Sequence, residues 1–244
     1  MTFHQTTRRL PRALGLLAAA ALTVAACGGS DEPVADPDEP AVETPVDTRP
    51  PVDGPVATLS PDIPDALEGG VGPVDVLGDP LLPLVSDVDD PSLGQQVPVR
   101  VGIDLEGRPI RIDPANDGPT MLVFVAHWCP HCNDEIPKLN RMRSFAQFPD
   151  GLNVVAVSTA VGPDRPNWPP DEWLRDDLNW KYPTMLDGID METESFVAAT
   201  AYGVTGFPFT VLVDGDGTVL DRWSGGREAD EILARLDVFA REDA

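Results

Sequence analysis

Two cysteines separated by two residues form the most reactive feature of the sequence. Cys129 and Cys132 lie in the run Trp128-Cys129-Pro130-His131-Cys132, and the chain contains only three cysteines. Two thiols at this spacing can close a small disulfide that opens and re-forms by thiol–disulfide exchange. The sequence therefore predicts redox chemistry carried by the cysteines themselves, with no bound cofactor.

Two other uses of the cysteine pair have to be weighed. A disulfide across two residues closes too short a loop to remove much entropy from the unfolded chain, so it would stabilise the fold only slightly. A four-cysteine zinc site requires a second pair, which the sequence lacks. His127 and His131 could join Cys129 and Cys132 as ligands, but six consecutive residues that enter a helix can hardly surround a tetrahedral ion. We therefore expect no metal here.

The motif stands between a strand-like segment and a helix-like segment. The apolar run 120–126 precedes it, and a helical pattern extends from Pro130 to about Phe148. Cys129 is then expected at a helix N-terminus, where unpaired backbone N–H groups and the helix dipole stabilise a thiolate. Cys132 would lie one turn into the helix and be more buried. We therefore assign Cys129 as the attacking thiolate and Cys132 as the resolving thiol.

Neighbouring side chains are candidates for tuning and substrate contact. His131 can hydrogen-bond to the Cys129 thiolate or pair with its charge, which would lower the thiol pKa and make the disulfide more oxidising; alternatively it is an exposed residue without a role. Trp128 would form an apolar wall beside the attacking sulfur, or simply pack. Glu135 follows Cys132 by three residues and shares its helix face.

Residues 97–244 are expected to form one α/β domain that carries the motif. The domain should contain a mixed central β-sheet flanked by helices, because strand and helix patterns alternate before a closing hairpin and helix. The expected strands, apart from 120–126, are 97–103, 108–112, 152–159, 184–186, 209–214 and 218–223, and the expected helices after the motif helix are 171–178, 194–202 and 228–241.

The first residues have the pattern of a bacterial lipoprotein signal. A basic start with Arg8, Arg9 and Arg12 precedes a short apolar run, and the segment 1–27 ends in Val-Ala-Ala-Cys, which resembles a lipobox. Cys27 would then become the acylated N-terminus of the mature protein; the alternative is an ordinary secreted protein. Either interpretation places the protein outside the cytoplasm, where disulfides persist, and the first anchors it to the cell membrane.

The segment 28–96 has the composition of a disordered linker. It is rich in proline and in acidic residues, and Arg49 is its only basic residue. We expect a flexible tether between the membrane and the domain. Two short apolar stretches, 76–77 and 81–85, are the part of it that could instead dock on the domain.

The charge excludes some classes of partner. The formal net charge is −24, and the domain is acidic as well as the linker. Such a protein is not expected to bind nucleic acid or to be attracted by charge to anionic lipid. We expect a monomer.

The domain resembles the thioredoxin fold, and specifically the membrane-anchored TlpA/ResA-type thiol–disulfide oxidoreductases. The resemblance rests on the cysteine motif, on Pro137 five residues after Cys132, on the segment 203–210 around Pro208, and on the Gly-Asp-Gly turn with the Gly225-Gly226 pair that follows. The Pro-His dipeptide between the cysteines resembles instead that of DsbA, which introduces disulfides.

This resemblance implies further roles. Pro208 would be a cis-proline that leaves the backbone of Phe207 free to pair with an extended substrate segment beside Cys129. Glu135 would handle protons during exchange, as an acidic residue does in the ResA-type branch; otherwise it is a surface glutamate. Thioredoxins place another acid six residues before the first cysteine, where this chain has Val123, which argues against that proton path.

The predicted function is disulfide exchange with the thiols of exported proteins, with an unidentified membrane redox partner resetting the site. The Pro-His pair favours oxidation of client proteins as the thermodynamic tendency. The alternative is a TlpA/ResA-like reductase that serves cytochrome c maturation. A peroxiredoxin-like peroxidase is disfavoured, because Ala126 and Leu122 occupy positions where that class carries Thr or Ser and Pro. A copper chaperone using the two thiolates is a further alternative.

Overall fold

The computed structural model describes residues 67–242. The central element is a five-stranded sheet with strand order β10-β9-β4-β5-β6. β4 (Thr120–Val125), β5 (Asn153–Ser158) and β6 (Thr184–Leu186) run parallel, whereas β9 (Phe209–Val213) is antiparallel to β4 and to β10 (Val219–Ser224). The α/β class with a mixed central sheet is therefore confirmed.

β4 lies in the middle of this sheet because its sequence is apolar on both faces. All six of its residues are buried. A strand that is apolar on both sides has to be covered by layers above and below the sheet. The motif therefore follows directly on a strand that is buried on both faces.

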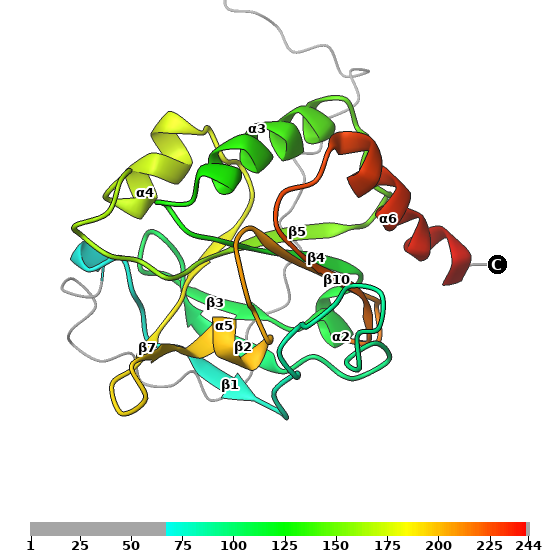
Figure 1. Ribbon diagram of the computed structural model, residues 1–244, viewed down its shortest axis with the longest axis horizontal. Helices are drawn as coiled ribbons and strands as arrows, with labels where there is room; N and C mark the ends of the chain where they lie inside the picture. The colour runs from blue at the N-terminus through cyan, green and yellow to red at the C-terminus, as the bar shows by residue number, and fades with distance from the viewer. Residues whose placement is uncertain (1–66, 243–244) are drawn as a thin grey trace, which may run out of the picture. The chain divides into compact units, whose positions relative to one another are not determined.

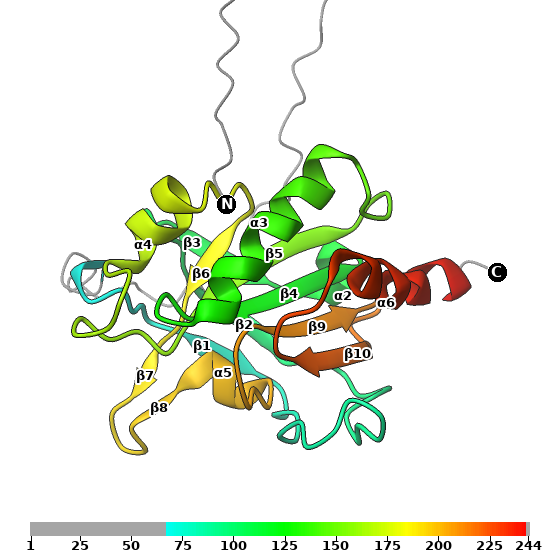
Figure 2. The same cartoon turned by 45° about the horizontal axis from the view of Figure 1, so that its top comes forward.

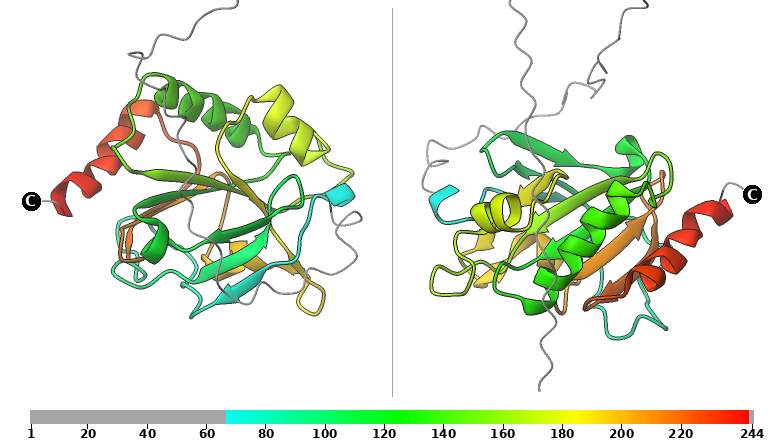
Figure 3. Two further views of the ribbon diagram at one scale, coloured as in Figure 1. Left: turned by 180° about the vertical axis from the view of Figure 1, so that it is seen from behind. Right: turned by 90° about the horizontal axis from the view of Figure 1, so that it is seen from above.

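One face of the sheet is covered by helices (Figure 1). α3 (Pro130–Ser144) crosses the sheet beside α6 (Ala229–Glu242), and α4 (Pro170–Glu172) lies near the other end of the sheet, as Figures 2 and 3 also show. The core beneath α3 and α6 includes Leu139 and Trp223, which are fully buried.

The opposite face carries a smaller sheet and short helices (Figure 1). β1 (Asp75–Leu77), β2 (Val99–Ile103) and β3 (Pro109–Ile112) form an antiparallel sheet in that order. α5 (Val197–Ala201) packs on the same side, and α2 (Pro114–Asp117) precedes β4. A second core between these elements and the sheet contains Phe124 and Tyr202.

The structure corrects the predicted boundary between linker and domain at residue 97. β1 pairs with β2, and Leu81 and Leu84 are buried, with 3% and 7% of their surfaces exposed. The apolar stretches that could dock do so in part, since Leu77, Leu82 and Val85 remain exposed. The rest of the predicted linker, and the signal segment with Cys27, lie outside the described residues.

Two helices differ from the predicted bounds. The segment 171–178 divides into α4 and a π-helical turn, η1 (Trp173–Asp177), in which the N–H of Leu178 donates to the carbonyl of Trp173. The segment 194–202 begins its helix only at Val197, because β8 (Ser195–Phe196) pairs with β7 (Ile189–Asp190) first.

A buried carboxylate explains where α5 begins. Asp187 accepts hydrogen bonds from the N–H groups of Ala198 and Ala199 at 2.7 and 3.0 Å, and from Thr159 Oγ1 at 2.7 Å. These bonds satisfy the first free N–H groups of the helix from outside its own sequence. Burial raises the pKa of Asp187, although these hydrogen bonds oppose that effect. The helix start therefore depends on a residue ten positions upstream, which local patterns do not show.

Candidate active site

Cys129 lies at the N-terminal tip of α3, as the spacing predicts. It is the residue before the first helical turn, with extended backbone angles of φ −81° and ψ 118°, and Pro130 follows it at the first helical position. Its carbonyl accepts the N–H groups of Cys132 and Asn133 at 3.1 and 3.3 Å. Proline suits this position because its missing N–H would have had no partner in the helix. The thiol is thereby held where the free N–H groups of the helix point.

The surroundings of Cys129 favour its thiolate. The pKa of Cys129 is lowered to about 6, mainly because the Cys132 thiol can donate a hydrogen bond to its sulfur. Burial opposes this lowering, while the backbone N–H groups of Cys132 and His131 and the charge of His131 add to it. A thiol with such a pKa is largely ionised at neutral pH, which is the form that attacks disulfides. His131 itself is exposed.

Cys132 has the opposite character. It is fully buried, and this burial raises its pKa well above that of a free thiol. The hydrogen bond to Cys129 and the nearby charges of Cys129 and Glu135 raise it further. Both cysteines are free thiols in this structure. The pair is therefore divided into one reactive thiolate and one protonated thiol.

The loop before β9 closes over Cys129 from the side. The Phe207–Pro208 peptide bond is cis, and the Cys129 sulfur lies 3.3 Å from the carbonyl oxygen of Phe207, to which the thiol donates when it is protonated. The Phe207 ring meets Trp128 edge to face, with 6.0 Å between the ring centroids. The carbonyl of Phe207 thus lies beside the attacking sulfur, and the Trp128 ring packs against the Phe207 ring.

Glu135 is a buried carboxylate. It has no exposed surface, so the alternative of a surface glutamate is wrong. Its Oε2 accepts the N–H of Arg227 at 3.0 Å, while Oε1 has no hydrogen-bond partner among the described residues. Burial raises the pKa of Glu135 to about 7, against the lowering effects of the Arg227 N–H and of the charges of Lys138 and Arg227. Glu135 can therefore take up and release a proton near neutral pH.

His127 has a structural position that the sequence did not indicate. Its Nδ1 donates to the carbonyl of Pro166 at 2.6 Å, and its Nε2 accepts the N–H of Gly162 at 3.1 Å. Burial lowers the pKa of His127, in keeping with this neutral tautomer. Both ring nitrogens are thus used to hold the loop that follows β5, and they do not face the thiols.

The loop held by His127 forms a second wall of the site. Trp128 Nε1 donates to the carbonyl of Ala160 at 2.6 Å, and the Arg165 guanidinium lies over the Trp128 ring, 4.5 Å from its centroid. Trp128 is therefore fixed between this loop and Phe207. Within residues 67–242 no cluster of three or more His, Cys, Asp or Glu side chains could hold a metal ion.

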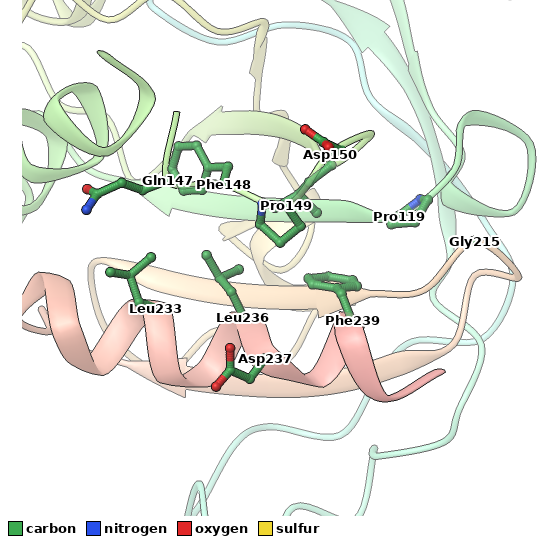
Figure 4. A pocket seen from close by; sticks show the side chains of 11 residues that line it. Pro119, Gln147, Phe148, Pro149, Asp150, Gly215, Leu233, Leu236, Asp237 and Phe239 are labelled. Atoms are coloured by element: carbon green, nitrogen blue, oxygen red, sulfur yellow. The ribbon is translucent and has the colours of Figure 1, made fainter. Parts of the chain in front are cut away.

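A separate cavity lies at the opposite end of α3. It has a volume of about 650 Å³, and Figure 4 shows Phe148 and Pro149 facing Leu233, Leu236 and Phe239 of α6 across it. Its lining contains no thiol or imidazole. The cysteine chemistry is thus confined to the N-terminal end of the helix.

Comparison with known proteins agrees with this geometry. Residues 110–240 match the thioredoxin-like domain family. The thiol-disulfide oxidoreductase ResA of Geobacillus thermodenitrificans is 28% identical over 60% of this chain and 77% of its own length. The thioredoxin-like protein YneN of Bacillus subtilis is 24% identical over 59% and 79%. The solved thioredoxin domain of a Bacteroides vulgatus thiol-disulfide oxidoreductase covers 60% of this chain and 96% of its own, at 22% identity and a TM-score of 0.46.

The fold and the cysteine pair define a thioredoxin-fold enzyme that exchanges thiols and disulfides. The chain belongs to the thioredoxin-like domain family, and the curated relatives to which it is similar include thiol-disulfide oxidoreductases named ResA.

The structure brings together every predicted site residue of the domain: the two cysteines, His131, Glu135, Trp128, Phe207 and Pro208. Sequence reasoning missed the anchoring of Trp128 through the loop after β5 and the contact of Arg227 with Glu135. No local pattern points to the latter contact, because Arg227 lies 92 residues after Glu135 in the sequence.

Proposed function

We propose that this protein exchanges disulfides with the cysteines of exported proteins through Cys129 and Cys132. The observation that carries the proposal is the contrast between the two thiols, one with a pKa lowered to about 6 and one fully buried with a raised pKa. Cys129 attacks a client disulfide or receives the attack of a client thiol, and Cys132 resolves the mixed disulfide.

We further propose that Trp128, Phe207 and cis-Pro208 form the client-binding border. The backbone of Phe207 lies beside the attacking sulfur, where an extended client segment could pair with it in place of the Cys129 contact. Glu135 serves as the proton acceptor and donor for Cys132, supported by its burial and by a pKa raised to about 7.

The proposal places the domain outside the cytoplasm, held at the membrane by acylated Cys27. This rests on the pattern of residues 1–27 and on the persistence of disulfides in exported compartments. None of the helices between residues 67 and 242 is long and apolar enough to cross a membrane. Mass spectrometry of the membrane fraction tests the anchor: an N-terminal peptide without acyl chains on Cys27 would contradict it.

The direction of electron flow has two candidates, each with its own support. The lowered pKa of Cys129 stabilises the reduced pair, which favours oxidation of clients. The buried Glu135 and the relatives named ResA favour a reductase, whose clients would include the apoprotein thiols of cytochrome c maturation. An unidentified membrane redox partner resets the site in either case.

The reduction potential of the Cys129–Cys132 disulfide, measured by equilibration with glutathione, decides between them. A potential near about −120 mV would support the oxidase and one near about −270 mV the reductase. His131→Pro should make the potential more negative if His131 stabilises the Cys129 thiolate, and an unchanged potential would remove His131 from the proposal.

Trapping of partners tests the division of roles between the cysteines. Cys132→Ser should accumulate mixed disulfides on Cys129, because the resolving thiol is absent, whereas Cys129→Ser should form none. The trapped species are counted by non-reducing gel electrophoresis and identified by mass spectrometry. Equal trapping by the two variants would contradict the assignment.

A further inference from the structure

A segment that precedes the family-matched region contacts the redox site through one arginine. The Arg227 peptide is held on both sides, since its N–H donates to Glu135 Oε2 at 3.0 Å and its carbonyl accepts Lys138 Nζ at 2.9 Å. The Arg227 guanidinium reaches in the other direction, to Asp87 Oδ2 at 3.0 Å. Arg227 therefore joins the buried carboxylate of α3 to an aspartate that lies before residue 110, where the family match begins.

Asp87 is itself fixed in place. Its Oδ2 also accepts Arg235 from α6 at 2.7 Å, and Arg235 is held by Asp221 at 2.8 Å. Burial is the largest single effect on the pKa of Asp87 and raises it, but the hydrogen bond from Arg227 and the charges of Arg235 and Arg227 together outweigh burial and lower the pKa. Asp87 is thus an anion at neutral pH with two cationic partners.

We propose that Asp87 is a positioning residue for the redox site: by holding the Arg227 guanidinium, it keeps the Arg227 N–H on Glu135 and so sets how readily Glu135 accepts the proton of Cys132. The inference rests on the proposed function. It gives the acidic segment before β2 a part in the chemistry, in addition to packing.

The step that Asp87 would influence is the resolution of a mixed disulfide. The Cys132 S–H bond breaks and its proton passes to the Glu135 carboxylate. The Cys132 sulfur then bonds to the Cys129 sulfur, and the bond between Cys129 and the client breaks, which releases the client as a thiolate. The client is reduced and the cysteine pair is oxidised; client oxidation follows the reverse order.

The sign of the effect separates positioning from simple charge. Lys138, Arg227 and Glu228 are the charged groups that act on Glu135, and Cys132 lies one turn before it on the same helix face. His131 is a further neighbour, across Gly226. Removal of the negative charge of Asp87 should by itself ease the ionisation of Glu135. Loss of the Arg227 N–H, or movement of its guanidinium away, should do the reverse.

The resolving step can be measured in the reduced full-length protein with dithiobis-nitrobenzoate. Attack by Cys129 releases one coloured nitrothiobenzoate anion, and resolution by Cys132 releases the second. We expect the rate of the second release to rise with pH around an inflection near 7, where Glu135 ionises. In Asp87→Asn this inflection should move to higher pH by about half a pH unit or more, the size expected when a hydrogen bond to a carboxylate is weakened. The pH dependence of the first release should not change.

Matched variants make the result specific. Asp89 is exposed and lies two residues away, so Asp89→Asn removes the same charge and should leave the inflection in place. Arg227→Gln should reproduce the upward shift, its combination with Asp87→Asn should add nothing, and Asp87→Glu should restore the original profile. Circular dichroism at each pH verifies folding.

Each outcome decides between specific claims. Superimposable profiles of the wild type and Asp87→Asn, a downward shift, or an equal shift in Asp89→Asn would overturn the positioning role while the exchange chemistry stands. Failure of the wild type to release the second nitrothiobenzoate at any pH would instead contradict the proposed function.

Discussion

At the scale of the residue, burial and position on one helix separate groups of similar chemistry. Cys129 and Cys132 are both buried, yet the pKa of the first is lowered to about 6 and that of the second is raised. The difference arises because Cys129 lies at the helix tip, where it accepts hydrogen bonds, while Cys132 donates one and lies deeper in the core. A three-residue step along one helix thus supplies a nucleophile and a thiol that stays protonated until it is needed.

Glu135→Gln tests the cost of burying this carboxyl group. The pKa of Glu135 is raised from 4.5 to about 7 in the folded protein, so the folded state binds its proton more tightly than the unfolded state does. The resulting stabilisation is complete below pH 4.5 and is lost as pH rises through 7. Between pH 4.5 and about 7, the free energy of unfolding of the wild type should therefore fall by up to about 3 kcal/mol relative to that of Glu135→Gln. Urea unfolding at several pH values measures this difference.

A neighbouring glutamate provides the control for that measurement. Glu228 pairs with Lys138 at 2.9 Å, but its side chain is 74% exposed. Glu228→Gln should therefore change the free energy of unfolding little. If the wild type and Glu135→Gln lose stability in parallel between pH 4.5 and 7, the raised pKa of Glu135 is wrong.

At the scale of the element, each part of the site is positioned by a different segment. β4 delivers the motif from the centre of the sheet, α3 orients the two thiols, and the turn before β9 brings Phe207 beside them. The loop after β5 fixes Trp128 through its hydrogen bond to Ala160. Three regions that are distant in sequence, β4 with α3, the loop after β5 and the turn before β9, therefore have to come together before the site is complete.

A buried ion pair attaches the segment before β2 to this assembly. Arg222 of β10 donates to Asp90 through Nε at 2.7 Å and also through its terminal nitrogen, and both side chains are almost completely buried. We expect Asp90→Leu to lower the free energy of unfolding by about 3–5 kcal/mol, because it leaves a buried guanidinium without its anion. The double variant Asp90→Leu, Arg222→Met should lose less free energy of unfolding than Asp90→Leu alone, because it leaves no unpaired buried charge. Thermal and urea unfolding measure both.

An ion pair on the surface provides the control that shows whether burial causes the large loss of stability expected for Asp90→Leu. Arg175 and Asp171 are 2.7 Å apart, with side chains 40% and 35% exposed. Asp171→Asn should cost at most about 1 kcal/mol. A comparable loss in Asp171→Asn and Asp90→Leu would mean that burial of the Arg222 pair is not what makes it important.

The elements that sequence patterns predicted are those whose signals are local. The cysteine spacing, the apolar run of β4 and the Asp-Gly turn between β9 and β10 each define an element within about ten residues. The start of α5 was missed because Asp187 caps it from upstream, and η1 was missed because it shares the apolar spacing of an ordinary helix. Glu135 was placed on the correct face, but its hydrogen-bond partner, the N–H of Arg227, is distant in sequence.

At the scale of the whole molecule, the folded domain begins earlier in the chain than the composition of the preceding segment predicts. A segment rich in proline and aspartate has the composition of a disordered chain, yet residues 67–96 supply β1, two buried leucines and two aspartates paired with arginines. Composition averaged over a segment does not show that a few anchors, such as Leu81 and Asp90, find partners far along the chain. Acidic character here contributes specific ion pairs as well as solubility.

Truncation of the chain tests this larger domain directly. A chain that begins at residue 67 retains β1, Leu81, Leu84 and Asp90, and it serves as the reference for thermal unfolding. A chain that begins at residue 97 should be several kcal/mol less stable, because each buried leucine contributes about 1.5–3 kcal/mol and because Arg222 loses its anion. Its exchange activity should fall in parallel as Arg227 loses Asp87. Equal melting temperatures for the two truncated chains would restore the boundary at 97 and reduce the preceding segment to a passive tether.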